Sequence, residues 1–157
     1  MILTVDIGNT IIAVGGFEGD MLAFVVRLAT NIKETSHEYA AKLDSTLRLS
    51  GTETHSLTAA VISSVVPQLT GTIREALKIA FGIDALSVGP GVKTGINIHC
   101  DDPSSVGADL ICVSVAAAKK YGSPCIIVDM GTATKIIHLG KNGTFEGVAI
   151  LPGAEIS

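Results

Sequence analysis

Two carboxylates in this chain each follow a short apolar run and precede a glycine-containing polar turn. The first cassette contains Asp6, Gly8, Asn9 and Thr10, and the second contains Asp129, Gly131, Thr132 and Thr134. A carboxylate at the end of a buried strand suits a hydrated Mg²⁺, a hard cation that prefers oxygen ligands. Glycine lets the backbone turn sharply and bring its N–H groups close to phosphate oxygens, and threonine adds a short hydroxyl donor.

One such cassette is also what an ordinary polar turn looks like, because Asp, Gly and Asn are common turn residues. The repetition favours the functional interpretation. Apolar runs at 2–5 and 125–128 precede the two copies, and polar turns at 18–20 and 141–143 follow them. An internal repeat of this size indicates two similar halves, each contributing one loop to a shared phosphate-handling site.

A third carboxylate, Asp109, lies between the two cassettes, early in a predicted helix over about 104–121. A carboxylate there can orient an acceptor hydroxyl and take its proton as the oxygen attacks a γ-phosphate. Alternatively, Asp109 only complements the helix dipole in an early turn. We favour the general-base role because Asp109 lies between two predicted phosphate loops.

The composition fits a compact, strand-rich protein: of 157 residues, 47% are hydrophobic, 17% are charged and 17 are glycine. Charged residues interrupt every apolar stretch short of the roughly 18 residues of a membrane span, and no basic segment precedes the first strand. A net charge of -4 and an aromatic content of 4% disfavour a nucleic-acid surface. We expect a cytoplasmic protein that contacts neither membrane nor nucleic acid.

Periodicity and turn residues place the cassettes on strands. The expected elements are strands at 2–7, 11–17 and 21–29, a helix at 37–50 capped by Ser36, a strand at 57–63, a helix from Pro67 that Gly82 ends, and a strand at 85–88. This βββαβαβ order is followed by the helix over 104–121 and by the second cassette. We place the first domain at 1–103. Residues 104–157 then hold the crossover helix and the beginning of a second domain.

A βββαβα half that starts again with the same cassette resembles the ribonuclease H-like duplication of actin, heat-shock chaperones and sugar and acetate kinases. The resemblance implies an α/β fold in which a ribonuclease H-like domain is followed by the start of a second, duplicated one. It also implies that ATP lies between the halves with its phosphates facing the two Asp-containing loops.

Six segments, in order, resemble the type III pantothenate kinases. They are 6–10 (DIGNT), 63–67 (SSVVP), 89–95 (GPGVKTG), 107–109 (GAD), 129–134 (DMGTAT) and 152–153 (PG). The resemblance implies ATP-dependent phosphorylation of pantothenate, the first step towards coenzyme A. It also implies Mg²⁺, a monovalent cation (K⁺ or NH₄⁺) and a homodimer.

The same resemblance implies a role for each matching residue. ATP phosphates are assigned to Asp6, Gly8, Asn9, Thr10, Gly131, Thr132 and Thr134. Asp6 also holds Mg²⁺ through water, Asp129 holds the monovalent cation, and Asp109 is the catalytic base. Substrate contacts are assigned to Cys100, Gly107, Ala108 and Leu110, with the loop at 89–95.

Some positions depart from the family pattern. Leu110 stands where the family usually has a substrate-holding Arg, Cys100 where it has an aromatic residue, Ile11 where it has Asn, and Lys135 where it has Thr. Losing the Arg removes a charge-assisted bond worth roughly 1.5–3 kcal/mol, and we expect Lys135 to offset part of that loss. Two alternatives therefore stay open: a catalytically degenerate nucleotide-binding protein with a regulatory role, and a kinase for another small hydroxyl acceptor.

Two such halves need about 250 residues at ordinary domain sizes. We therefore expect either a fragment of a longer protein or a chain that does not complete the site alone. For residues 1–157 in isolation we expect weak or no kinase activity.

Overall fold

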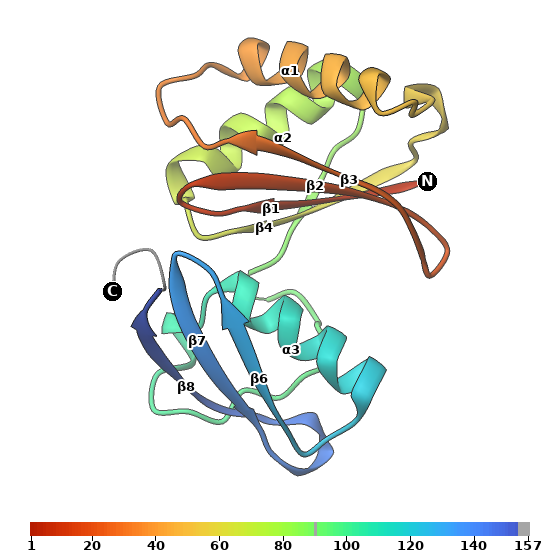
Figure 1. The fold of residues 1–157 in the computed structure, drawn as a ribbon. Coiled ribbons are helices and arrows are strands. Elements are labelled where there is room, and N and C mark those ends of the chain that lie inside the picture. Colours follow the sequence, from red (N-terminus) through yellow and green to blue (C-terminus); the bar gives the residue numbers. More distant parts are fainter. Residues whose placement is uncertain (90, 154–157) are drawn as a thin grey trace. The chain divides into compact units, whose positions relative to one another are not determined.

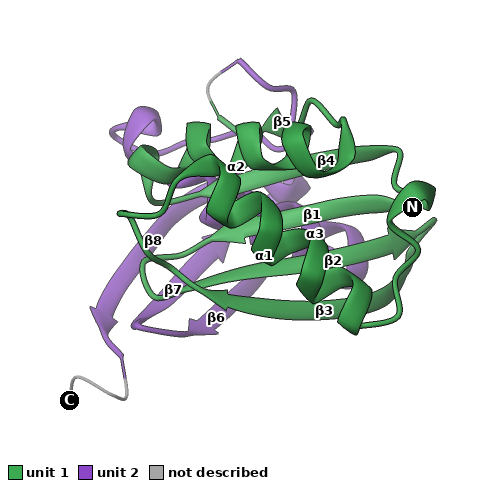
Figure 2. Cartoon of the chain, turned by 90° about the horizontal axis from the view of Figure 1, so that it is seen from above, with its two compact units in different colours: residues 1–89 green, residues 90–157 purple. Residues whose placement is uncertain are grey.

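The computed structural model describes residues 1–89 and 91–153. Two compact units make up the chain, Met1–Gly89 and Pro90–Ser157 (Figure 2). The segment before residue 104 belongs to the second unit because Ile96, Ile98 and Cys100 pack against its core. The predicted domain boundary between residues 103 and 104 stays a prediction, and Pro90 of the predicted substrate loop lies outside the described residues.

The first unit follows the predicted order (Figure 1). Its elements are β1 (Ile2–Ile7), β2 (Ile11–Glu18), β3 (Met21–Ala29), α1 (Ser36–Leu49), a 3₁₀ turn (Thr54–Ser56), β4 (Ala59–Ser64), α2 (Pro67–Phe81) and β5 (Leu86–Ser87). The strand order in the sheet is β3-β2-β1-β4-β5. β1, β2 and β3 are antiparallel neighbours, whereas β4 runs parallel to both β1 and β5. The predicted βββαβαβ arrangement is confirmed.

Strand alternation decides which face of β1 is buried. Leu3, Val5 and Ile7 are fully or almost fully buried in a core that α1 and α2 share. Both helices lie over the same face of the sheet (Figure 1). Asp6 therefore projects from the opposite face, where it is exposed at the end of the strand.

Helix ends follow local side-chain chemistry. The predicted cap of α1, Ser36, is wrong by one residue: Thr35 is the N-cap. Glu38 decides this, because its carboxylate accepts from the Thr35 N–H at 2.7 Å while the Thr35 side chain accepts from the Glu38 N–H, a capping box. As predicted, α2 begins at Pro67 and ends before Gly82, whose left-handed backbone has φ 70°.

In its described residues 91–153, the second unit has one α-helix beside a small sheet. Its elements are a 3₁₀ turn (Pro103–Ser105), α3 (Ala108–Tyr121), β6 (Cys125–Met130), β7 (Ala133–Leu139), a 3₁₀ turn (Lys141–Gly143) and β8 (Phe145–Pro152). The helix predicted from residue 104 starts at Ala108 instead. Asp102 causes the difference, because its carboxylate accepts from the Ser104 N–H at 3.0 Å and closes a separate turn.

The antiparallel β6-β7-β8 sheet repeats the β1-β2-β3 pattern, as the duplicated cassette predicts. One face packs against α3 around Leu110, Ile137 and Phe145. On the other face of β6, Ile126 and Val128 are exposed. Among the described residues, the second unit therefore has a core on one side of its sheet only.

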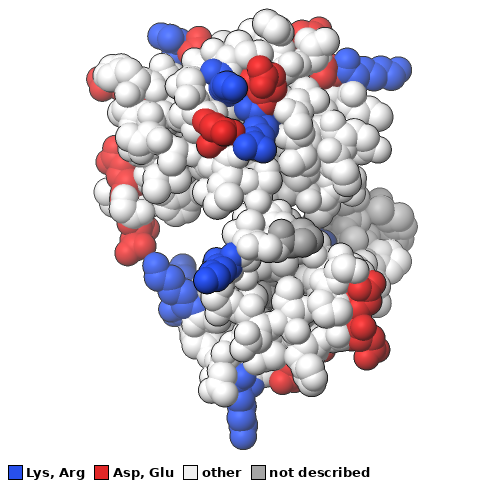
Figure 3. All heavy atoms as spheres, turned by 180° about the vertical axis from the view of Figure 1, so that it is seen from behind, with Lys and Arg blue, Asp and Glu red and all other residues white. Residues whose placement is uncertain are grey.

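No helix among the residues that the structure describes is long and apolar enough to cross a membrane. On the face drawn in Figure 3, Lys and Arg side chains lie among acidic and uncharged ones rather than in one broad basic area. The predicted cytoplasmic location and the predicted lack of nucleic-acid binding stay predictions.

Candidate active site

The first cassette forms a loop between β1 and β2 that is held by hydrogen bonds. The Gly8 N–H donates to the Ile11 carbonyl at 3.0 Å, which closes the turn. Thr30 fastens the loop from the end of β3, because its hydroxyl donates to the Gly8 carbonyl at 2.7 Å and its N–H donates to the Thr10 carbonyl at 3.0 Å. Asn9 and Thr10 are exposed at the tip. The sequence missed the contribution of Thr30, since it depends on the β2–β3 register.

This loop fits the Mg²⁺ and phosphate that the sequence predicts there. A Cβ at Gly8 would lie 3.0 Å from the Ile11 carbonyl oxygen, so the tight turn favours glycine. Asp6, Asn9 and Thr10 present carboxylate, amide and hydroxyl oxygens, all from exposed residues. No group of three or more His, Cys, Asp or Glu within 1–89 and 91–153 could hold a metal. A Mg²⁺ held by one carboxylate, water and phosphate needs no such group.

In the second unit, one lysine joins the two carboxylates that the sequence singled out. Lys135 Nζ lies 2.7 Å from Asp109 Oδ2 and 3.0 Å from Asp129 Oδ2. Asp129 and Lys135 are direct partners in the β6–β7 register, and Asp109 comes from the first turn of α3. The side chains of Lys135 and Asp109 are 24% and 19% exposed, and that of Asp129 is 41% exposed. The structure thus brings the predicted base and the predicted cation ligand together around a single ammonium.

The cluster holds Lys135 in its charged form. Burial by itself lowers the pKa of Lys135, but the hydrogen bonds to Asp109 and Asp129 outweigh that effect and raise the pKa above its ordinary value of 10.5. An added monovalent cation at Asp129 would lie beside this ammonium and be repelled by it. The side chains around Asp129 therefore do not fit a mobile monovalent cation.

The loop predicted to bind phosphate in the second unit is closed by a contact of its own. The Gly131 N–H donates to the Ala133 carbonyl at 3.2 Å, so this loop closes one residue earlier than the first. Thr132 is exposed, whereas Thr134 is the partner of Met130 and lies on the sheet face opposite Lys135.

Gly153 fits directly against this loop. A Cβ at Gly153 would lie 2.4 Å from the carbonyl oxygens of both Gly131 and Thr132. Only a residue without a side chain allows the chain after β8 to approach the loop so closely. Pro152 and Gly153 form one of the segments that resemble the family, but no role was expected for Gly153.

Two predicted substrate residues, Cys100 and Leu110, line one open hollow of about 980 Å³ in the second unit. The remaining lining residues are His99, Asp101, Asp102, Ser105, Val106, Phe145, Glu146, Gly147, Val148 and Ile150. The His99 N–H donates to the Phe145 carbonyl at 2.8 Å, which holds the segment before Cys100 against β8.

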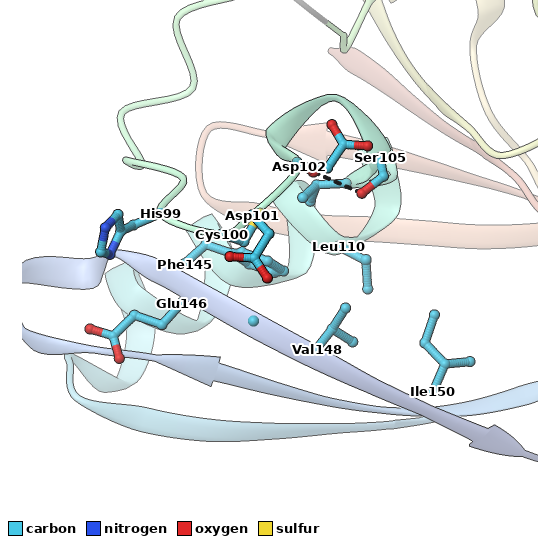
Figure 4. Close-up of a pocket in the computed structure, with 12 residues that line it drawn as sticks. His99, Cys100, Asp101, Asp102, Ser105, Leu110, Phe145, Glu146, Val148 and Ile150 are labelled. Carbon is cyan, nitrogen blue, oxygen red and sulfur yellow. Dashed lines mark hydrogen bonds between the residues drawn. The ribbon is translucent and has the colours of Figure 1, made fainter.

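Figure 4 shows an apolar end at Leu110, Val148 and Ile150 and a polar end at His99 and Glu146. None of the described side chains lining this hollow is Lys or Arg. A substrate carboxylate placed here would therefore find no ammonium or guanidinium partner among them.

The other two predicted substrate residues have structural positions at the start of α3. Gly107 is the N-cap, and its carbonyl accepts from the Ile111 N–H at 3.2 Å. Ala108 is buried, and neither residue lines the hollow. Their predicted substrate contacts stay predictions.

The sequence pattern of the type III pantothenate kinase family matches residues 2–157. The type III pantothenate kinase of Shouchella clausii is 43% identical over 158 residues, which cover 100% of this chain and 62% of that protein. The type III pantothenate kinase of Geobacter sulfurreducens is 42% identical over 157 residues, with the same coverage of 100% and 62%. The chain therefore spans about 62% of the length of these relatives.

Solved structures share the fold at low identity. A candidate 2-dehydro-3-deoxygalactonokinase from Sinorhizobium meliloti has a TM-score of 0.56 at 14% identity, over 96% of this chain and 53% of that one. A conserved candidate Baf family transcriptional activator from Campylobacter jejuni has a TM-score of 0.52 at 20% identity, over 98% and 55%. With the sheet order, these likenesses confirm the predicted ribonuclease H-like fold class. By its sequence match over almost its whole length, the chain belongs to the type III pantothenate kinase family.

Proposed function

We propose that the whole protein transfers the γ-phosphate of ATP to pantothenate and forms 4′-phosphopantothenate, the first step of coenzyme A biosynthesis. The family match over residues 2–157 carries this proposal. The position of Asp109 supports it, because Lys135 joins this carboxylate to Asp129 beside the second loop, and a carboxylate near the transferred group can orient the acceptor hydroxyl.

Asp109 is the general base in this proposal. Its carboxylate takes the proton of the pantothenate hydroxyl while the hydroxyl oxygen bonds to the γ-phosphorus and the bond to the bridging oxygen breaks, releasing ADP. Lys135 holds Asp109 Oδ2 at 2.7 Å, so it fixes the orientation of the carboxylate, and the other oxygen receives the proton. Phosphoryl transfer needs mainly positioning, which this contact supplies.

In this proposal each cassette binds phosphate oxygens, as the family resemblance implies. The phosphate-binding residues of the first loop are Asp6, Gly8, Asn9 and Thr10, and those of the second are Gly131, Thr132 and Thr134. Asp6 would hold Mg²⁺ through water, and the ion would supply positive charge beside the phosphate oxygens. The tied geometry of the first loop supports this role, since its hydrogen bonds hold the turn in shape before the nucleotide arrives. A homodimer, as the family resemblance implies, belongs to the same proposal.

Two observations favour the alternatives. Lys135 already pairs with the proposed base, which favours a nucleotide-binding protein without transfer activity. Leu110 lines a hollow without Lys or Arg among its described residues, which favours a kinase for an uncharged hydroxyl acceptor.

A substrate panel separates the three functions. Protein purified at the full length that its gene encodes is incubated with Mg²⁺-ATP and with pantothenate, pantetheine or a sugar, and the products are identified by mass spectrometry. Phosphorylated pantothenate supports the proposal, and a phosphorylated uncharged acceptor alone supports the second kinase. Nucleotide binding without any phosphorylated acceptor supports the binding protein.

A further inference from the structure

Lys135 places a covalently attached positive charge where the family resemblance predicts a bound monovalent ion. The monovalent cation was expected at Asp129, and the Asp129 Oδ2 already accepts from Lys135 Nζ at 3.0 Å. The same ammonium donates to Asp109 at 2.7 Å. One cation of this chain thus serves both carboxylates.

The surroundings hold the ammonium in this place. Lys135 lies in β7 opposite Asp129, so the strand register fixes where its side chain starts. Its side chain is 24% exposed, and the side chain of Asp109 is 19% exposed. A partly buried pair is screened less by salt than an exposed one. Release of Lys135 would leave two neighbouring carboxylates without a shared counter-ion.

The ammonium of Lys135 is chemically suited to replace a monovalent cation. An ammonium group and K⁺ carry the same charge and are similar in size, and NH₄⁺ is itself one of the predicted cations. Two such cations against the same carboxylate oxygen would repel each other, so a bound Lys135 and a bound K⁺ exclude one another. The family resemblance implies Thr at position 135, a residue that supplies no charge.

We propose that Lys135 is a built-in substitute for the monovalent cation, so that phosphoryl transfer by this protein needs neither K⁺ nor NH₄⁺. The catalytic part of this inference rests on the proposed function. The binding part does not, because it concerns only whether K⁺ occupies the carboxylate cluster.

The experiment compares the full-length protein with Lys135→Thr, which restores the residue type of the family pattern. Ionic strength is held constant with tetramethylammonium chloride, which is replaced by KCl, NH₄Cl or NaCl. Product is detected directly by mass spectrometry, because coupling enzymes that themselves need K⁺ would mask the effect. Lys141→Ala, which removes an exposed lysine of the same unit, is the matched control.

For the wild type and Lys141→Ala, we expect rates that agree within about twofold in all salts. For Lys135→Thr, we expect at least about a tenfold loss without K⁺ or NH₄⁺ and recovery with either ion, each tenfold step being about 1.4 kcal/mol. The melting temperature gives a readout independent of activity. K⁺ should raise it by about 2–4 °C in Lys135→Thr and by less than about 1 °C in the wild type.

A wild-type rate or melting temperature that depends selectively on K⁺ would overturn the inference. So would a Lys135→Thr protein that responds to K⁺ in neither readout. If the wild type phosphorylates no pantothenate in any salt, the proposed function fails, and the melting temperatures alone decide the inference. If Lys135→Thr does not fold, Lys135→Gln replaces it. The dependence of the wild-type rate and melting temperature on K⁺ tests the inference in either case.

Discussion

Replacing Lys135 by Met removes the ammonium and keeps most of the side-chain length. Asp109 Oδ2 and Asp129 Oδ2 lie 2.7 and 3.0 Å from the same nitrogen, so they are at most 5.7 Å apart, the sum of the two distances. At this largest separation, Coulomb's law gives a repulsion of about 0.7 kcal/mol at the permittivity of water and about 3 kcal/mol at an effective permittivity of 20, and a shorter separation raises both values.

The exposure of the two carboxylates determines how strong their repulsion is. The side chain of Asp129 is 41% exposed, so solvent screens its repulsion from Asp109. The mutant also loses two charge-assisted hydrogen bonds but no longer desolvates an ammonium. We expect Lys135→Met to lower the free energy of unfolding by about 1–2 kcal/mol.

Urea unfolding at neutral pH, followed by circular dichroism, measures the loss. Hydrogen exchange localises it, because amides of α3 and β7 lose about tenfold in protection for each 1.4 kcal/mol. Raising the salt from about 0.01 to about 1 M shortens the screening length from roughly 30 to 3 Å. The difference in unfolding free energy between the wild type and Lys135→Met should therefore become smaller.

The double variant Lys135→Met/Asp109→Asn should recover about 1 kcal/mol, because it removes the repulsion. Lys141→Met should stay within about 0.5 kcal/mol of the wild type. An equally stable Lys135→Met, or a double variant less stable than the single one, would refute the reasoning.

Three further predictions follow from particular contacts. Gly153→Ala places a Cβ within 2.4 Å of the Gly131 and Thr132 carbonyls, so we expect the free energy of unfolding in urea to fall by about 1–3 kcal/mol and the KM for ATP to rise. Gly71→Ala is the control, because a Cβ at Gly71 meets open space. Equal effects of the two substitutions would contradict the packing argument. The pKa of Glu38 lies below its ordinary value of 4.5, chiefly because the Thr35 N–H hydrogen-bonds to its carboxylate. A lowered pKa stabilises the fold above about pH 4.5, so Glu38→Gln should be less stable than the wild type at pH 7, with a gap that closes as the pH falls below 4.5; a gap independent of pH would argue against the capping box. Leu110→Arg buries a guanidinium in the core that Leu110 shares with Ile137 and Phe145, so we expect a loss of about 2–4 kcal/mol in urea unfolding; a variant as stable as the wild type would contradict the packing of Leu110 in this core.

Local rules predicted most of the first unit. Strand alternation identified β1, and the signals of Pro67 and Gly82 bounded α2. The cap of α1 was misplaced because Thr35 and Ser36 are both good N-cap residues, and only the Glu38 three residues after Thr35 distinguishes them. That signal was present in the sequence.

The carboxylate cluster was harder to predict because it depends on tertiary structure. Asp109 and Lys135 are 26 residues apart and meet only when α3 packs on the sheet. The pairing of Lys135 with Asp129 depends on a loop that closes one residue earlier than the first cassette does, and a shift of one residue would turn Lys135 to the other face. The sequence identified the three residues but not the bond network among them.

The most direct test of the central claim compares wild type with Asp109→Asn in the conversion of pantothenate to 4′-phosphopantothenate, with product measured by mass spectrometry and nucleotide binding measured by calorimetry. We expect product from the wild type, a loss of at least about a hundredfold in kcat for Asp109→Asn, and similar ATP affinity for both. Unchanged turnover by Asp109→Asn would contradict the role of this carboxylate as the base, and a wild type that binds ATP but forms no product would contradict the kinase itself.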